Sequence, residues 1–405
     1  MTAEATVPEA GVTYGARGLG RSVSLLYATV YLHYGVFGLF IPVWLAHAGL
    51  QSKAIGMLLA TPMLLRILFV APVTALADHL RRIRELLFAC IVGTAGFVAM
   101  LGLVHGFVAM AIFFVALSVV WDPLPILADA YAVAAVRARK LDFGRMRVWG
   151  SLGFVLANLA GGKALDLMGI GAMPMLTAGL LIVPLLVIPF LPPDRQLGSP
   201  EPPPRGEWRM LLKDRDLLVV MFATTLIVAS QGLFGAFSAI HWSAEHYSST
   251  FIGFLSAVGI GSEVVVLWGA QKALGARSPL ILILVAGAMT LARWLLMSLD
   301  PKPGFMIALQ LLNGGGMGVI AGLMLFIAQR APVRLMATAQ GINAVVLGVT
   351  AAVVAAASGF VWQAFGSQGY LLMAAIAAVG MAIIAVHLKG AKSAAIYPEP
   401  ETANS

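Results

Sequence analysis

The chain has 405 residues, of which 60% are hydrophobic and only 11% are charged, and its mean hydropathy is +0.92. A water-soluble protein of this length could not cover so much apolar surface with so few charges, so the composition excludes an ordinary soluble protein and indicates one that lies in the lipid bilayer. The net charge of +8 does not indicate a nucleic-acid partner, because most of the 26 lysines and arginines fall in alternate connections and in the two tails. That distribution is the positive-inside bias of a multi-pass membrane protein.

Apolar runs of about 20 residues, the length that crosses a bilayer, recur along the chain. They predict twelve membrane-spanning helices and an all-α integral membrane fold, with the helices at 23–45, 54–77, 86–104, 107–135, 146–165, 173–191, 216–240, 251–271, 279–299, 305–328, 337–361 and 369–388. The expected organisation is an N-terminal tail, a six-helix bundle, a Pro-rich linker, a second six-helix bundle and a C-terminal tail, at 1–21, 22–191, 192–215, 216–388 and 389–405. The charge bias makes both termini and the linker cytoplasmic, in a bacterial-type inner membrane.

The two predicted bundles share a sequence repeat. HYGVFGLF at 33–40 matches SQGLFGAF at 230–237 in its Gly, Phe, Gly and Phe positions, 197 residues apart. The same offset relates Ile55-Gly56 to Ile252-Gly253, Gly144 to Gly341 and Arg66 to Glu263. A period near half the chain length indicates one bundle used twice, and such repeats commonly enclose a transport site between the halves.

Five charged residues fall well inside the predicted helices: Arg66, Asp122, Asp129, Glu263 and Arg293. A charge at membrane depth costs at least about 2.5–3.5 kcal/mol, so each is a candidate functional residue, and ion pairs that only hold helices together are the structural alternative. The repeat directs Arg66 and Glu263 towards the same central axis from opposite halves. A carboxylate in such surroundings is suited to take up and release a proton, so Glu263 is the predicted proton carrier.

Other polar and aromatic side chains could stack on a solute or form hydrogen bonds with it, although each could equally serve packing: Tyr31, Tyr34, Trp121, Gln231 and Asn313. Pro123 and Pro125 beside Asp122 indicate a bend or a cavity in the fourth helix. Lys163 and Asp166 lie near a helix end, where they can reach the membrane interface, and are interpreted as structural. The glycines of 314–322 indicate close helix packing or a flexible point in the tenth helix.

Several function classes lack their motifs. There is no Gly-rich phosphate loop, no His-Glu-x-x-His helix and no Ser/His/Asp set at one membrane depth, so the chain is not expected to be an ATP-driven pump or an enzyme. The single cysteine, Cys90, is expected to pack, and no removable signal peptide is predicted. His241, Glu245 and His246 are interpreted as a solvated loop rather than a metal site, so no metal and no cofactor are expected.

The segment LDFGRMRVWGSLGF at 141–154, with ADHLRRIRE at 77–85, resembles the major facilitator superfamily. The similarity extends over nearly the whole chain, through PLPILAD, the helix with Glu263 and ARW ending at Trp294, and it is strongest to the phenylpropionate permease family, which is related to the lactose and nucleoside proton symporters. The resemblance implies two six-helix bundles that transport a solute by alternating access.

Lactose permease has a similar FGR-x-R segment that forms part of its sugar site. The resemblance implies that Asp129 pairs with Arg147 and that Phe154, two turns further along the same helix face, is available to stack. Arg147 could instead be an ordinary cytoplasmic charge. Arg293 matches an arginine of the ninth helix that takes part in coupling in that relative.

The chain departs from these relatives at two positions. Asn313 stands where lactose permease carries a histidine of its proton pathway, and Gln231 stands where phenylpropionate permease relatives carry histidine. Proton coupling is therefore assigned to Glu263, with Arg293.

The predicted function is import of a small organic solute by proton symport, driven by the proton gradient. The resemblance favours an aromatic carboxylate, with Arg66 as its partner. A sugar or nucleoside proton symporter is the alternative, and a non-transporting membrane sensor or lipid-handling enzyme is an alternative of another class. The expected partners are the solute, protons and lipid, with no nucleic acid, and the expected unit is a monomer.

Overall fold

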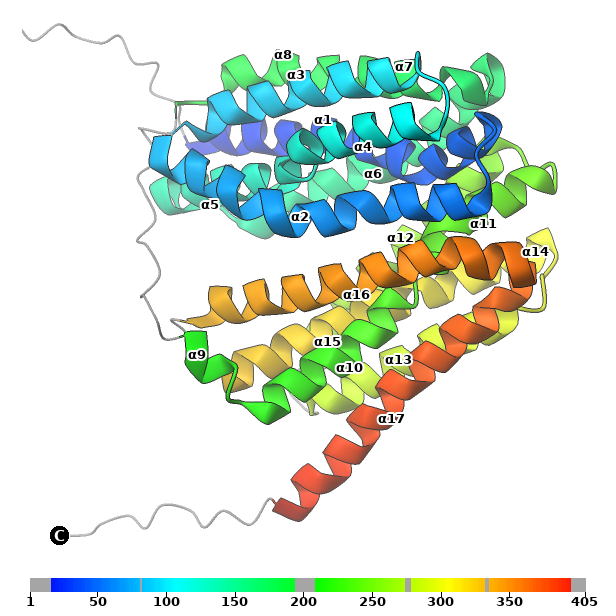
Figure 1. Cartoon of the computed structure of the whole chain (residues 1–405). Helices are drawn as coiled ribbons and strands as arrows, with labels where there is room; N and C mark the ends of the chain where they lie inside the picture. The colour runs from blue at the N-terminus through cyan, green and yellow to red at the C-terminus, as the bar shows by residue number, and fades with distance from the viewer. Residues whose placement is uncertain (1–15, 81, 194–207, 274–277, 332–334, 395–405) are drawn as a thin grey trace, which may run out of the picture.

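The computed structural model describes residues 16–80, 82–193, 208–273, 278–331 and 335–394. These residues form helices joined by short connections and contain no strand (Figure 1). The N-terminal half comprises α1 (Ala16–His47), α2 (Ser52–Leu80), α3 (Ile83–Leu101), α4 (Phe107–Trp121), α5 (Pro123–Arg139), α6 (Phe143–Met168), η1 (Ile170–Ala172), α7 (Met173–Leu180), α8 (Ile182–Val187) and η2 (Ile188–Phe190). The C-terminal half comprises α9 (Trp208–Leu211), α10 (Arg215–Ala229), α11 (Gly232–Ala244), α12 (Ser249–Ala273), α13 (Pro279–Met297), α14 (Pro303–Gln310), η4 (Leu311–Asn313), α15 (Gly314–Arg330), α16 (Met336–Phe365), η6 (Gly366–Gly369) and α17 (Tyr370–Ala394).

The described residues contain nine segments that are long and apolar enough to cross a membrane. One of these, Thr338–Lys389, holds both α16 and α17. The helices α2 and α6, with 29 and 26 residues, are also long enough to cross about 30 Å of hydrocarbon. Together these segments correspond to the twelve predicted helices.

Four predicted helices are interrupted. The fourth divides into α4 and α5 at Asp122, because Pro123 occupies the first position of α5 and has no N–H to continue the α4 ladder. The sixth divides at Leu181 into α7 and α8. The seventh divides at Ser230 and Gln231, and the tenth at the short 3₁₀ turn η4, just before the glycine run. The breaks in the fourth, seventh and tenth helices fall near the middle of the spans and lie at polar residues, namely Asp122, Gln231 and Asn313.

The helix ends differ from the predicted boundaries. The first helix begins at Ala16 rather than near residue 22, and the last continues to Ala394 rather than ending at 388, so part of each predicted tail is helical. The remainder of the tails and residues 194–207 of the predicted linker lie outside the described residues.

The sequence repeat is also a repeat of structure. Equivalent helices begin or end 197 positions apart, as at Ser52 and Ser249, Met173 and Tyr370, and Met168 and Phe365. The two halves therefore carry the same order of helices, with α2 equivalent to α12 and α6 equivalent to α16.

The halves contact each other along two equivalent seams, α2 with α16 and α6 with α12 (Figure 1). A Cβ atom added to Gly56 would lie 2.9 Å from the backbone nitrogen of Gly359, and one added to Gly253 would collide with the carbonyl of Asn158. Gly56 and Gly253 are equivalent positions of the repeat. Glycine is thus required at the same point of both seams, since it lets the two backbones approach closely.

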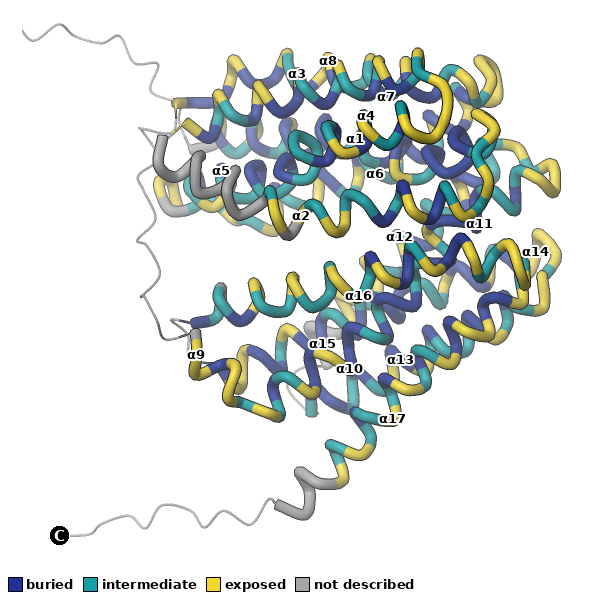
Figure 2. Tube along the Cα trace, in the orientation of Figure 1, coloured by how far each residue is buried: buried dark blue, intermediate teal, exposed yellow. Residues whose placement is uncertain are grey.

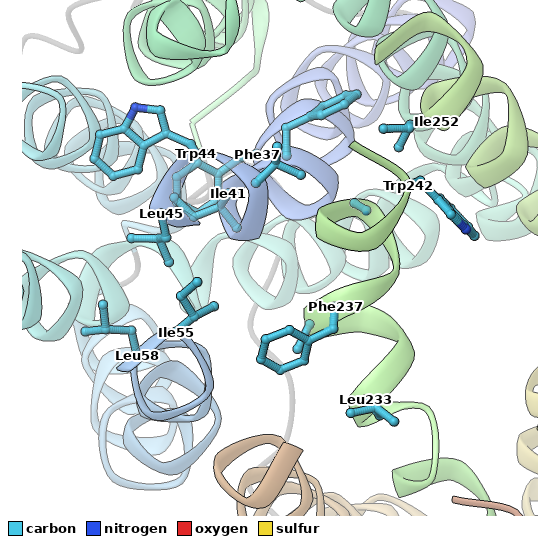
Figure 3. Packing of buried hydrophobic residues seen from close by; sticks show 14 of the residues in the cluster. Phe37, Ile41, Trp44, Leu45, Ile55, Leu58, Leu233, Phe237, Trp242 and Ile252 are labelled. Atoms are coloured by element: carbon cyan, nitrogen blue, oxygen red, sulfur yellow. The ribbon is translucent and has the colours of Figure 1, made fainter. Parts of the chain in front are cut away.

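Both seams lie at the end of the molecule where α2 and α12 begin, and the axes of α2 and α16 diverge from there towards the opposite end (Figure 1). An apolar cluster shared by both halves fills this end of the molecule, the closed end, and includes Phe37, Ile41, Ile55, Phe237 and Ile252 (Figure 3). Two further clusters lie one in each half. Buried and exposed positions alternate along the helices (Figure 2), and apolar residues such as Val108, Val265 and Val386 are exposed, as a lipid-facing surface requires.

Asp166, near the end of α6, reaches across the second seam. Its carboxylate accepts hydrogen bonds from the backbone N–H of Ser249 (2.6 Å) and Thr250 (3.0 Å) and from the hydroxyl of Thr250 (2.5 Å). An acidic side chain at a helix N-terminus satisfies free N–H groups and interacts favourably with the helix dipole. Asp166 is therefore an N-terminal cap of α12 that is supplied by the other half.

Asp166→Ala is expected to shift the population away from the state with the seam closed by about fivefold, since loss of a helix cap costs about 1 kcal/mol. Spin labels at Leu167 and Glu245, on opposite halves of this end, should show a larger fraction of long distances by double electron–electron resonance. The matched control is Asp142→Ala, because Asp142 caps α6 within its own half. Identical distance distributions for both variants would mean that Asp166 does not hold the seam.

Candidate functional site

A buried arginine forms the centre of a polar cluster in the C-terminal half. Arg293 on α13 is fully buried and donates hydrogen bonds to Gln231 Oε1 (3.2 Å), Asn313 Oδ1 (2.5 Å) and Gln310 Oε1 (2.9 Å). Its guanidinium carbon also lies 4.0 Å from the centre of the Phe234 ring. The cation is thus stabilised by three neutral amides and an aromatic face rather than by direct contact with a carboxylate.

Glu263 on α12 joins this cluster through Asn313. The Asn313 Nδ2 group donates a hydrogen bond of 2.7 Å to Glu263 Oε1, while the Oδ1 atom of the same amide accepts from Arg293. Among the described residues, Glu263 makes no ion pair within 4.0 Å. One asparagine therefore links the acid to the buried cation, and the carboxylate can change its protonation state without breaking a direct salt bridge.

A cavity of about 400 Å³ lies beside Glu263. The N-terminal half contributes Leu39 and Phe154 to its wall, and the C-terminal half contributes Phe234, Trp242 and Ser256, together with Glu263, Gln231, Gln310 and Asn313. The volume falls within the range of about 300–1,000 Å³ found for sites that hold small molecules. Aromatic faces with a few polar groups, drawn from both halves, give the composition of a solute site.

The N-terminal half holds a second polar cluster, on α1, α5 and α6. Asp129 accepts a hydrogen bond from the Tyr27 hydroxyl (2.6 Å) and lies 3.6 Å from Arg147 Nε. Arg147 donates to the Tyr31 hydroxyl (2.7 Å) and lies over the Tyr31 ring at 4.5 Å. Arg147 is therefore half-buried against tyrosines, not a free charge in solvent, and the expected pairing of Asp129 with Arg147 is present in the structure.

Unsatisfied polar groups lie next to this cluster. The Tyr34 and Trp121 rings stack at 5.0 Å, and the Tyr34 hydroxyl donates to the Trp121 carbonyl (2.6 Å). Trp121 Nε1 and Asp122 Oδ2 are buried without a hydrogen-bond partner in the described structure. Arg66 is exposed, interacts with Asp122 only electrostatically at longer range, and forms no ion pair with a described residue. Buried groups of this kind usually have a partner, so a ligand is one candidate for satisfying them.

The structure gathers most of the predicted site residues into these two clusters, with one difference in position. Phe154 was expected to lie with Arg147 and Asp129, but it lines the cavity beside Glu263 instead. The spacing of two turns gives the distance between Arg147 and Phe154 along the helix axis but does not say which neighbouring helix each side chain faces. Because α6 also packs against α12, Phe154 faces that helix.

Gln310 belongs to the cluster around Arg293 but was not among the residues predicted from the sequence, although a signal was available. Gln310 stands three residues before Asn313, so the two share a helix face, and both accept from Arg293. The aromatic wall formed by Phe234 and Trp242 was not predicted either, because the apolar composition of the helices does not distinguish it from ordinary packing.

The structure also describes the glycine run and the surroundings of His241. A Cβ atom at Gly315 would lie 2.7 Å from the Ala286 carbonyl and one at Gly318 would lie 2.8 Å from the Ala286 side chain, so the glycine run serves close packing of α15 on α13. His241 hydrogen-bonds to Asp300 (2.7 Å), and the described residues contain no group of three or more possible metal ligands around it.

Comparison with known proteins identifies the family. The model of the MFS_1 like family matches residues 22–373. The chain is 27% identical over 374 residues to the probable 3-phenylpropionic acid transporter of Escherichia coli (strain K12), covering 89% of this chain and 96% of that protein. It is 28% identical over 349 residues to the maltose permease of Geobacillus stearothermophilus, covering 83% and 86%.

Solved structures show the same fold. The nucleoside transporter NupG matches with a TM-score of 0.79 at 16% identity, over 92% of this chain and 99% of that one. A bacterial homologue of the human lysosomal transporter Spinster, inward-facing and unoccupied, matches with a TM-score of 0.74 at 12% identity, over 96% and 100%. The predicted all-α membrane fold of two six-helix bundles is confirmed, and the chain belongs to the MFS_1 like family of the major facilitator superfamily, as a transporter and not an enzyme.

Proposed function

We propose that the protein imports a small organic anion, with an aromatic carboxylate as the first candidate, by proton symport and alternating access. The observation that carries the proposal is the position of Glu263, which lines a cavity between the halves and is bound only through Asn313 to a buried arginine. The similarity of the chain to the probable 3-phenylpropionic acid transporter of Escherichia coli favours the aromatic acid as the solute.

The coupling follows from the charge of the C-terminal cluster. When Glu263 is ionised, its negative charge balances the positive charge of Arg293, and Asn313 forms hydrogen bonds with both side chains. When a proton binds Glu263, the cluster keeps the positive charge of Arg293 alone, which favours an anion in the adjacent cavity. By linkage, the bound anion strengthens proton binding to the same extent, so solute and proton are carried together.

The substrate carboxylate is assigned to Arg66. This residue occupies the position of the first half that corresponds to Glu263 in the second, is exposed and has no described ion-pair partner. A guanidinium can bind a carboxylate through two parallel hydrogen bonds. Arg66 does not line the cavity beside Glu263, so the solute would extend from Arg66 to that cavity, with its aromatic part against Phe154, Phe234 and Trp242.

Arg66→Gln is expected to weaken binding of 3-phenylpropionate by about 10- to 100-fold, since a hydrogen bond to a charged group contributes about 1.5–3 kcal/mol. Binding of the neutral analogue 3-phenylpropionamide should change little. The affinity of Arg66→Lys for 3-phenylpropionate should lie between those of Arg66→Gln and the parent. Calorimetric titration of the purified protein measures all three. Equal losses for the acid and the amide would contradict a role of Arg66 in carboxylate recognition.

A sugar or nucleoside is the second candidate substrate. The cavity wall carries the side-chain amides of Gln231, Gln310 and Asn313 and the hydroxyl of Ser256, which suit a solute with many hydroxyl groups. The similarity to a maltose permease points the same way. Titration with maltose and with nucleosides in the same binding experiment decides between the classes of solute. A solute that binds in this experiment but is not taken up by vesicles would indicate a sensor.

The proposed orientation places both termini in the cytoplasm of a bacterial-type inner membrane, because basic residues cluster in the connections on that side. In that orientation the closed seams face the outside. The proposed working unit is a monomer in lipid that binds solute and protons, without nucleic acid and with no cofactor beyond the proton gradient.

A further inference from the structure

A second cavity lies away from the solute site, at the cytoplasmic end of the N-terminal half in the proposed orientation. It has a volume of about 740 Å³ and lies between the first turns of α1, the turn from α5 to α6 and the first turns of α6. Arg21, Lys140 and Arg145 line it together with Asp142. None of the residues that line this cavity also lines the cavity beside Glu263.

The cations of this cavity have few protein partners. Asp142 caps α6 by accepting from the backbone of Arg145 (3.1 Å), and its other oxygen lies 3.6 Å from the Arg145 guanidinium. Arg21 and Lys140 form no ion pair with any described residue. With three cations and one carboxylate, the wall carries an excess of positive charge that is available to an anion.

The cavity continues into an apolar surface. Leu25 and Trp149 line it and are 51% and 49% exposed, and Leu152 and Leu156 follow Trp149 on the same face of α6 with exposures of 60% and 58%. On α1, Leu25 points away from Tyr27, whose hydroxyl faces the interior at Asp129. The site therefore combines cations, an exposed tryptophan beside them and exposed leucines that follow along the same face of α6.

We propose that this cavity binds an anionic phospholipid, with the headgroup phosphate held by Arg21, Lys140 and Arg145 and an acyl chain lying along Leu25, Leu152 and Leu156. Basic pockets between helices on the cytoplasmic side are suited to anionic headgroups, and each cation near the surface adds to the attraction. A soluble phosphate compound would contact the cations alone, whereas a phospholipid also contacts the exposed tryptophan and leucines that continue from them.

Native mass spectrometry of the protein released from nanodiscs that contain phosphatidylcholine and phosphatidylglycerol tests the proposal. The double variant Arg21→Gln, Lys140→Gln is expected to retain phosphatidylglycerol with roughly tenfold lower affinity than the parent. The matched control removes two exposed cations on the same side of the other half, by Lys213→Gln and Lys389→Gln, and should retain the lipid like the parent. The charge-conserving variant Arg21→Lys, Lys140→Arg should also retain it.

Two outcomes would overturn the proposal. Equal retention by the double variant and the Lys213, Lys389 control would show only general attraction to a basic surface. Binding of glycerol 3-phosphate to the cavity in detergent, in competition with phosphatidylglycerol and with equal affinity, would make the occupant a soluble phosphate. As an independent readout, phosphatidylglycerol with brominated acyl chains should quench the tryptophan fluorescence of the parent more than that of Trp149→Phe, and equal quenching would also contradict the proposal.

Discussion

Replacement of Glu263 by glutamine is expected to abolish accumulation of the solute against its gradient, while solute binding stays within about threefold of the parent. Glutamine can still accept the hydrogen bond from Asn313 Nδ2 that Glu263 accepts at 2.7 Å, so the shape of the cavity wall is kept. It cannot take up and release a proton at accessible pH, so the link between proton and solute is lost. Uphill uptake and solute exchange in membrane vesicles measure the two properties separately.

The matched control is Glu245→Gln, because Glu245 is an exposed carboxylate at the end of α11, outside the described cavity. This variant should accumulate the solute like the parent. If Glu263→Gln still drives uphill uptake, another group carries the proton. If Glu263→Gln loses solute binding together with accumulation, Glu263 contacts the solute, and its assignment to the proton alone is wrong.

Replacement of Arg293 by methionine is expected to give the largest loss of stability. Arg293 is fully buried and supplies hydrogen bonds to three amide oxygens, of Gln231, Gln310 and Asn313. Each buried acceptor left without a donor costs about 1–3 kcal/mol, and partial rearrangement of the amides leaves a total of about 3 kcal/mol. The midpoint of thermal unfolding should therefore fall by several degrees.

Cys90 allows this unfolding to be followed directly. It is the only cysteine and is 5% exposed, so a thiol-reactive dye should label it only when the protein opens. Arg82→Met, which removes an arginine whose side chain is 54% exposed, is the control and should shift the midpoint little. Arg293→Lys keeps the charge but cannot donate to all three amides, so its unfolding midpoint should lie between those of Arg293→Met and Arg82→Met. An unchanged midpoint for Arg293→Met would contradict the structural role.

The sequence predicts the fold well because two strong physical constraints determine it. Apolar runs of bilayer length mark the helices, and charges inside them are costly enough to be rare, which singled out Glu263 and Arg293. The repeat added the equivalence of α2 and α12, which the positions of Ser52 and Ser249 at the two helix starts confirm.

The remaining features depend on contacts between residues that are far apart in the chain. Asp166 and Thr250 lie 84 residues apart, and Tyr27 and Asp129 lie 102 apart, so neither bond follows from local spacing. The orientation of α6 about its own axis places Phe154 at the cavity and Arg147 against the tyrosines. This orientation depends on packing against both α1 and α12. The break at η4, which precedes the glycine run, has no signal in hydropathy.

Proton movement on addition of the solute tests the central claim most directly. De-energised, lightly buffered vesicles that contain the protein would receive 3-phenylpropionate, maltose or a nucleoside outside while the external pH is recorded. Symport predicts a rise in external pH with one class of solute in the parent and no rise in Glu263→Gln. Uptake of a labelled solute by the parent without any change in pH would show transport that is not coupled to protons and would contradict the mechanism.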